Sequence, residues 1–171
     1  ARNLTGIGSA TVAFAQEDSY KTLPGTPTWY QVGVIEDVTD ATFDRQLTRP
    51  RQPDDPRPKE SREGNREGSF SITFQMTDTN YHPLIFPESS NTSLATSAAL
   101  APTATWYIKS DLLSGSSERF LVGAAVESIT WNYQQGEPPT VEMSIIYGDE
   151  DGSLSAPSSI SQPSVGDAVD F

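Results

Sequence analysis

The feature that most constrains the fold is a strict alternation of apolar and polar residues in GSFSITFQM, residues 68–76. The apolar members all fall at even positions: Phe70, Ile72, Phe74 and Met76. Because successive side chains of a strand point to opposite faces, this pattern predicts a strand with one face in a core and the other in water. Residues 141–147 repeat it. Further strands are expected at 9–16, 29–37, 38–47 and 104–110.

Between residues 118 and 135 the apolar residues alternate with polar ones in two stretches that are out of phase with each other. Phe120, Val122, Ala124 and Val126 are even-numbered, whereas Ile129, Trp131 and Tyr133 are odd-numbered. We therefore predict a one-residue phase slip near Glu127–Ser128, either as a bulge or as a tight corner. Trp131 alternates with Ile129 and Tyr133, which predicts that its indole is buried in the core.

Seven or eight short strands separated by turn signals predict an antiparallel β-sandwich or barrel. One short helix is expected within 78–87, capped by Asp78 or Asn80, with Pro83 in its first turn. Tyr81, Leu84 and Ile85 would face the core. A chain of 171 residues has room for one such domain. No apolar run approaches the roughly 18–20 residues of a membrane span.

Some segments do not look like core. Residues 45–68 form a long inter-strand loop, of a length that is uncommon in compact domains unless the loop has a function. Residues 88–102 are rich in small residues and predict a surface segment. Residues 149–171 lack periodicity and are interpreted as a C-terminal arm. The expected organisation is a β domain over 1–148, with extended terminal arms.

The charge is strongly acidic, with 23 Asp and Glu against 11 Lys and Arg, a net charge of −12. Only three of the bases are lysines. An acid excess with little lysine is typical of a halophilic surface, which carboxylates keep solvated in high salt. An ordinary acidic protein is the alternative.

The cations are concentrated in the long loop. Outside residues 45–67 the chain has four bases and eighteen acids, hence −14, whereas that segment has seven bases and five acids, hence +2. Four prolines between 50 and 58 favour a stiff, extended backbone. We interpret the loop as a projecting arm that pairs with carboxylates of a neighbouring copy. Its cations are Arg45, Arg49, Arg51, Arg57, Lys59, Arg62 and Arg66.

Two other interpretations of this loop stay open. One is a solvated loop of mixed charge with no partner. The other is a DNA-binding arm, which the interspersed acids and the lack of aromatic residues weaken.

Catalytic chemistry is hard to place on this chain. It has no cysteine and a single histidine, His82, beside Pro83. No phosphate-binding or dinucleotide motif occurs, and GDEDGSLS (148–155) lacks the alternating ligands of a calcium loop. We expect no enzyme, no cofactor and no metal site.

The order of parts resembles the major tail tube proteins of long-tailed, siphovirus-like viruses. The resemblance is carried by the entrance DSYKTLP (18–24), by EGSFSITFQMTDTNYHPLIF (67–86), and by the closing strands TATWYIKS, RFLVGAAVESITWNY and PPTVEMSIIYG. It covers most of residues 6–148. The acidic, lysine-poor composition suggests a haloarchaeal host.

The resemblance implies a structural virion protein of the tail, assembled in the host cytoplasm, whose hexameric rings stack into a hollow tube. The long loop would contact the adjacent ring. Other implied partners are the tape-measure protein and further tail proteins, with viral DNA passing through without specific binding and no membrane insertion. Carboxylates facing the lumen would repel phosphates; the alternative places them on the outer surface. Candidates are Asp37, Asp40, Asp44, Glu127 and Glu142.

Other functions are considered as alternatives. A carbohydrate-binding or adhesin β-sandwich could use Trp29, Trp106 and Trp131 as stacking surfaces. Another virion component, a tail terminator or a capsid decoration protein, could share a related fold.

Overall fold

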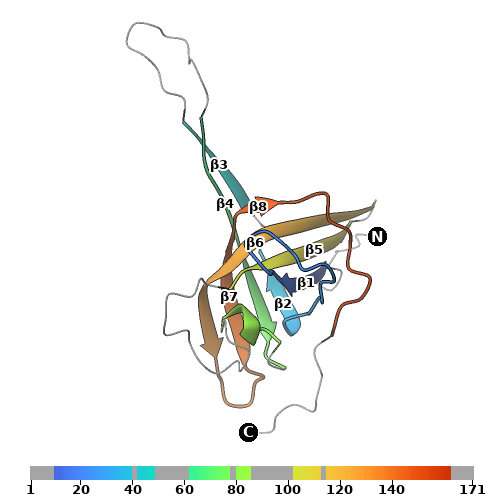
Figure 1. Cartoon of the computed structure of the whole chain (residues 1–171). Helices are drawn as coiled ribbons and strands as arrows, with labels where there is room; N and C mark the ends of the chain where they lie inside the picture. The colour runs from blue at the N-terminus through green and yellow to red at the C-terminus, as the bar shows by residue number, and fades with distance from the viewer. Residues whose placement is uncertain are drawn as a thin grey trace, which may run out of the picture.

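The structure is a computed structural model, and it describes residues 10–39, 42–48, 62–77, 80–85, 102–112 and 115–162. Its described part is mainly β, and antiparallel strands form one strongly curled sheet (Figure 1). This confirms the predicted class of an antiparallel sandwich or barrel. In chain order the strands are β1 (Ala10–Gln16), β2 (Val34–Val38), β3 (Thr42–Thr48), β4 (Arg62–Gln75), β5 (Ala104–Leu112), β6 (Gly115–Asn132), β7 (Thr140–Tyr147) and β8 (Asp149–Glu150).

The spatial order of the sheet is β1-β5-β6-β7-β4-β2, with β3 paired to β4 and β8 to β6. The long strand β6 belongs to both halves, since residues 115–124 pair with β5 and residues 125–132 pair with β7. The register against β7 shifts between Val126 and Ser128. This confirms the predicted phase slip, and the apolar side chains before and after it can both face the core.

Two predicted strands begin later than expected. Within 29–37, Tyr30 makes only isolated bridges, to Phe14 and Ser161, and the strand itself starts at Val34. Within 38–47, the strand starts at Thr42 and continues to Thr48. Asp40 lies outside the described residues.

The main core fills the concave side of the sheet, where the even-phase residues of β4 meet β7 and β1. The largest fully buried side chains of this core include Trp106, Tyr81, Tyr147 and Phe14. Phe70 and Trp106 meet edge to face with ring centroids 5.4 Å apart, a geometry that adds to the burial of their area.

A second, smaller core lies on the other face of β1 and β5. Ala13, Ala15, Trp29, Tyr107 and Phe120 are buried there. Strand β1 is therefore covered on both faces, and its apolar run AFA fits that position.

Residues 149–162 lie against the body rather than apart from it. Leu154 and Ile160 pack on the second core. The Ser161 amide donates to the Trp29 carbonyl (2.8 Å), and the Ser161 carbonyl accepts from the Gln31 amide (3.0 Å). The predicted arm therefore docks on its own domain over these residues. A domain boundary after residue 148 stays a prediction.

The expected helix is a single 3₁₀ turn, His82–Leu84, with Pro83 in its first turn as predicted. Its N-cap residue is Tyr81, without a side-chain capping bond, so the predicted cap at Asp78 or Asn80 is wrong. Tyr81 and Leu84 are buried, as expected. No helix among the described residues has the length and apolar character needed to cross a bilayer.

The predicted loop 45–68 is in part a β-ribbon. Strands β3 and β4 pair from Thr42↔Ser69 to Thr48↔Arg62, and this ribbon runs beyond the rest of the sheet (Figure 1). Arg45, Arg62 and Arg66 are therefore strand residues and not loop residues. The hairpin pattern was missed because its residues are polar and show no apolar alternation.

Candidate interaction surfaces

The outward face of β2, β4, β7 and β6 is built from short polar side chains. Register pairs align Asp37, Thr73, Glu142 and Thr130 in one row across the four strands. Paired residues of neighbouring strands share a face. We call this surface the polar face; it comprises Asp37, Ser69, Ser71, Thr73, Gln75, Ser128, Thr130, Asn132, Thr140, Glu142 and Ser144, together with Glu36 and Thr39, which hydrogen-bond to Gln75 and Ser71, and Glu127 at the register shift of β6.

Hydrogen bonds between these side chains make the polar face regular. The Ser71 amide donates to Thr39 Oγ1 (2.7 Å), and the hydroxyls of Ser71 and Ser144 lie 3.4 Å apart. Gln75 Nε2 donates to Glu36 Oε1 (2.7 Å). Hydroxyl and amide groups of neighbouring strands on this surface therefore bond to one another.

The polar face carries charge of one sign. Residues 34–39, 69–75, 125–132 and 140–146 contain four acids and no Lys, Arg or His. The acids are Glu36, Asp37, Glu127 and Glu142, and all four are exposed. A face with several carboxylates and no cation has a negative potential that repels polyanions.

The four strands of the polar face end in two edges. Among the described residues, β2 pairs only with β4, and residues 125–132 of β6 pair only with β7. Each ladder from β6 to β2 is antiparallel, so the two outer strands run in opposite directions. Strand edges with unpaired amides and carbonyls are sites where another chain can add.

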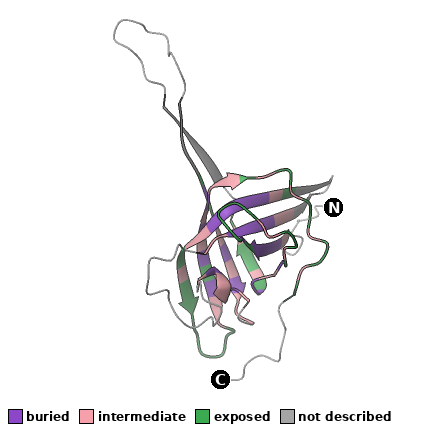
Figure 2. Ribbon diagram, viewed as in Figure 1, coloured by how far each residue is buried: buried purple, intermediate pink, exposed green. Residues whose placement is uncertain are grey.

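The end of β6 is exposed (Figure 2), and it carries Trp131 and is followed by Tyr133. Trp131 is 41% exposed and Tyr133 is 68% exposed. The prediction that Trp131 is buried in the core is therefore wrong. The Trp131 side chain lies on the core-facing side of β6. However, β6 is the outermost described strand at this point, so one side of the indole is uncovered.

Trp131 is nevertheless held in place. Its Nε1 donates to the Tyr81 hydroxyl (3.3 Å), which in turn donates to Met76 Sδ (3.2 Å). Burial raises the pKa of Tyr81 above its ordinary value. The exposed indole is thus held by a part-buried chain of hydrogen bonds.

The structure brings together some of the predicted lumen-facing acids. Asp37 and Glu142 share a row of the polar face, and Glu127 is exposed at the register shift of β6. Asp44 is the register partner of Glu67 on the β3–β4 ribbon. Asp40 lies outside the described residues, so its position stays a prediction.

The predicted contact cations are only partly within the described residues. Arg45 is the register partner of Arg66, and Arg62 is the partner of Thr48. Arg49, Arg51, Arg57 and Lys59 lie outside the described residues. The assignment of all these cations to a contact between copies stays a prediction.

Sequence reasoning missed several residues. Glu36 and Glu67 belong to the acidic surface but were not proposed, and Val34 is a 39% exposed apolar residue at the β2 edge. A signal for Glu67 was present, since it precedes Ser69, Ser71 and Thr73 in the polar phase of β4. Among the described residues, no group of His, Asp and Glu could hold a metal ion.

Comparisons with known proteins give this arrangement a family. Residues 9–171 match the family described as phage tail tube protein. The solid-state NMR and cryo-EM structure of the SPP1 tail tube is similar at 11% identity and TM-score 0.48, covering 81% of this chain and 74% of that chain. The tail of an empty gene transfer agent particle is similar at 8% identity and TM-score 0.49, covering 85% and 96%. No curated protein matches.

The family match therefore defines the class of this protein, a structural protein of a virion tail. The chain belongs to the phage tail tube protein family. This family is structural and not known for enzymes. Two of the three tryptophans that a carbohydrate-binding module would use, Trp29 and Trp106, are buried at 5% and 1% exposure.

Proposed function

We propose that this chain forms hexameric rings that stack into the hollow tail tube of a siphovirus-like virion and conduct viral DNA to the host. The single observation that carries the proposal is the four-stranded polar face with an open edge on each side, in a member of the tail tube family.

Ring closure follows from the direction of the outer strands. Because β6 and β2 run in opposite directions, the β6 edge of one copy can pair with the β2 edge of the next and keep the antiparallel alternation. A head-to-tail contact of this kind repeats around a symmetry axis and closes into a ring. Trp131 and Tyr133 on one edge and Val34 on the other would bury apolar surface at this seam.

The polar face then lines the channel. Its exposed acids Glu36, Asp37 and Glu142, together with Glu127, give the wall a negative potential. Phosphates of passing DNA are repelled, so the DNA slides without sticking. Asp40 and Asp44 add to this wall if their segments face the axis.

Stacking uses the arginine-rich β3–β4 ribbon as the contact to the adjacent ring. A hexamer carries six times −12, or −72, and rings of like charge repel one another. Guanidinium groups of the ribbon offset this by bidentate pairing with carboxylates. Further partners are the tape-measure protein and other tail proteins, and the acidic, lysine-poor composition supports a haloarchaeal host.

Electron microscopy of purified protein tests the proposal. The wild-type chain should form rings and tubes. The triple variant Arg49→Glu, Arg51→Glu and Arg57→Glu should give folded subunits or single rings without long tubes. Tubes of normal length from this variant would refute the contact role of the segment 45–68, and a wild-type chain that stays monomeric in molar salt would refute ring formation.

A further inference from the structure

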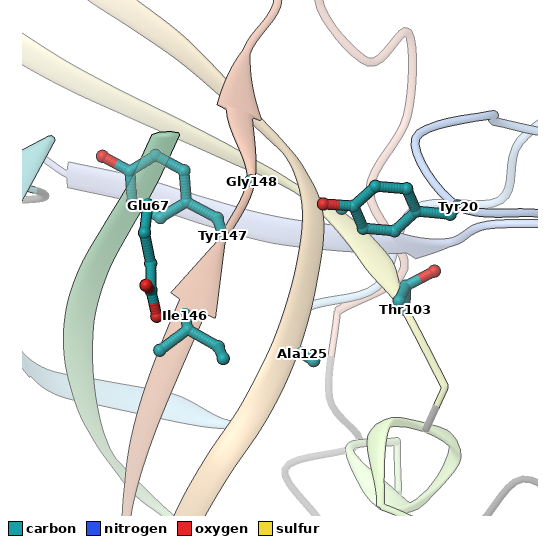
Figure 3. Close-up of a pocket in the computed structure, with 8 residues that line it drawn as sticks. Tyr20, Glu67, Thr103, Ala125, Ile146, Tyr147 and Gly148 are labelled. Carbon is teal, nitrogen blue, oxygen red and sulfur yellow. The ribbon is translucent and has the colours of Figure 1, made fainter. Parts of the chain in front are cut away.

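A pocket of about 390 Å³ opens on the polar face near the base of the β3–β4 ribbon. Figure 3 shows Glu67 of β4 on one side and Tyr20, from the β1–β2 connection, on the other. Ile146 of β7 and Ala125 of β6 lie between them. The pocket therefore combines a carboxylate wall, an aromatic wall and an aliphatic floor.

Tyr20 is 61% exposed, yet its ring is closely fitted to the backbone. A Cβ on Gly123 would stand 2.6 Å from Cε2 of the ring, and one on Gly148 would collide with the hydroxyl. Both positions need glycine for the ring to lie there. An exposed aromatic side chain seated on two glycines is positioned rather than free.

The turn that carries Tyr20 is anchored from inside the domain. Lys21 adopts φ 62, and the Thr22 amide donates to the Ser19 carbonyl (2.8 Å). The buried carboxylate of Glu17 accepts from the Lys21 amide through Oε2 (2.8 Å), and from the Gly123 amide and Thr105 Oγ1 through Oε1 (both 2.8 Å). Strained backbone is costly and clusters at functional sites, and the buried carboxylate is compensated by its three hydrogen bonds.

The Tyr147 hydroxyl at the pocket donates to Glu150 Oε1 (3.4 Å), whereas two other polar groups of the pocket form no such bond within the described part of the chain. Neither the Glu67 carboxylate nor the Tyr20 hydroxyl forms a hydrogen bond or ion pair there, and no cation lines the pocket. Lys21 Nζ lies over the Tyr20 ring, 5.4 Å from its centroid, and also donates to the Gly148 carbonyl (3.3 Å) and lies 3.6 Å from Asp149. The pocket thus offers the Glu67 carboxylate to a cation from elsewhere, beside a ring that Lys21 already faces.

Arginine fits this combination best. Its guanidinium pairs with a carboxylate and stacks on an aromatic ring, while its methylene stem covers apolar surface. Arg66 of the same chain adjoins Glu67 in β4 and is the register partner of Arg45. Successive residues of a strand belong to opposite faces.

We propose that this pocket receives an arginine side chain from the segment 45–66 of a second copy of the chain. The inference rests on the proposed stacking of rings and names where the cationic ribbon docks. Complementary charge supports it, because that segment holds six arginines and the remainder of the chain is strongly acidic.

Photo-crosslinking identifies the occupant directly. With p-benzoylphenylalanine in place of Tyr20, irradiated assemblies should give intermolecular crosslinks to peptides within 45–66. Intermolecular crosslinks only to other surfaces, or crosslinks only within one chain, would overturn the inference.

A variant series separates docking from folding. Glu67→Gln and Tyr20→Leu should keep the wild-type circular dichroism and raise the protein concentration needed for tube assembly about tenfold, since each removes one half of a charge-assisted contact. The control Glu118→Gln removes an exposed acid of β6 outside the pocket and should leave assembly unchanged. If wild type assembles and Glu67→Gln matches Glu118→Gln, the docking site is wrong. If wild type does not assemble at all, ring stacking itself is wrong.

Discussion

Asp37 and Glu142 flank Thr73 in one register row of the polar face, so carboxylates of β2 and β7 stand on the same surface with a single strand between them. If this surface lines a channel, the sign of its charge determines whether DNA passes through or is retained. The double variant Asp37→Lys and Glu142→Lys should form tubes that retain short duplex DNA, whereas wild-type tubes should not.

Co-sedimentation of tubes with fluorescent DNA at low salt measures this effect, because salt screens phosphate contacts. The double variant Asp18→Lys and Glu118→Lys, at two exposed acids outside the polar face, serves as the matched charge change. Equal retention by the two variants would place the row on the outside of the tube.

The buried carboxylate of Glu17 should dominate the stability of the β1–β2 connection. Glu17→Ala leaves the Lys21 and Gly123 amides and the Thr105 hydroxyl without their acceptor. We expect a loss of about 3 kcal/mol in the free energy of unfolding, measured by urea denaturation. Asp18→Ala, at the exposed neighbouring position, should change it by less than about 0.5 kcal/mol. Similar losses for both variants would contradict the role given to Glu17.

Substitutions at three glycines distinguish the cost of a positive φ from the cost of a steric clash. Gly136 has φ 83 with open space around it, Gly123 has φ 65 and the Tyr20 ring above it, and Gly25 has open space and no positive φ. Substitution by Ala should cost about 1 kcal/mol at Gly136, more than about 2 at Gly123, and less than about 0.5 at Gly25. Thermal unfolding of the three variants checks this order, and a Gly123→Ala protein as stable as Gly25→Ala would show that Tyr20 is free to move.

Tyr133 should matter for assembly and not for folding. Because its side chain is 68% exposed, Tyr133→Ser should shift the free energy of unfolding by no more than about 0.5 kcal/mol. At a seam between subunits it would bury its ring, and its loss should weaken ring formation about tenfold or more. Analytical ultracentrifugation reads out both rings and subunits. Unchanged ring formation would remove the β6 edge from the seam.

Asp151 gives a pH dependence with a defined sign. Hydrogen bonds from the Ser153 hydroxyl (2.6 Å) and amide (2.8 Å) lower the pKa of Asp151 below its ordinary value. A lowered folded-state pKa stabilises the fold above the unfolded-state pKa, and this contribution is lost as the pH falls through the folded-state value. Ser153→Ala should raise the pKa part of the way back, as an NMR titration of the carboxyl carbon would show. An unchanged pKa would mean that the hydrogen bond from the Ser153 amide alone lowers the pKa of Asp151.

The alternation of apolar and polar residues predicted those strands that have one buried face and one exposed face. Phe70, Ile72 and Phe74 are buried while Ser71 and Thr73 between them are not, because β4 has the core on one side only. The phase slip at Glu127–Ser128 was readable for the same reason, since core-facing residues on both sides of it kept their period.

The features that the sequence pattern did not predict depend on contacts between distant segments of the chain. Glu17 continues the buried phase of Ala13 and Ala15, but a charged residue is seldom buried without partners supplied by distant segments, here Thr105 and Gly123. Trp131 has the phase of a core residue and lies at a sheet edge, which only the strand order reveals. The sequence predicted the polar positions within each strand. Their alignment into one face across four strands depends on the register of the strands, which the sequence pattern does not give.

The central claim is that the polar face lines the tube. A cryo-EM reconstruction of tubes assembled from the full chain tests it most directly. The account predicts six subunits per ring, continuous strand pairing between the β6 and β2 edges of neighbours, and Asp37 and Glu142 directed at the axis. A reconstruction in which these carboxylates face the outside of the tube, or in which the two edges never meet, would contradict it.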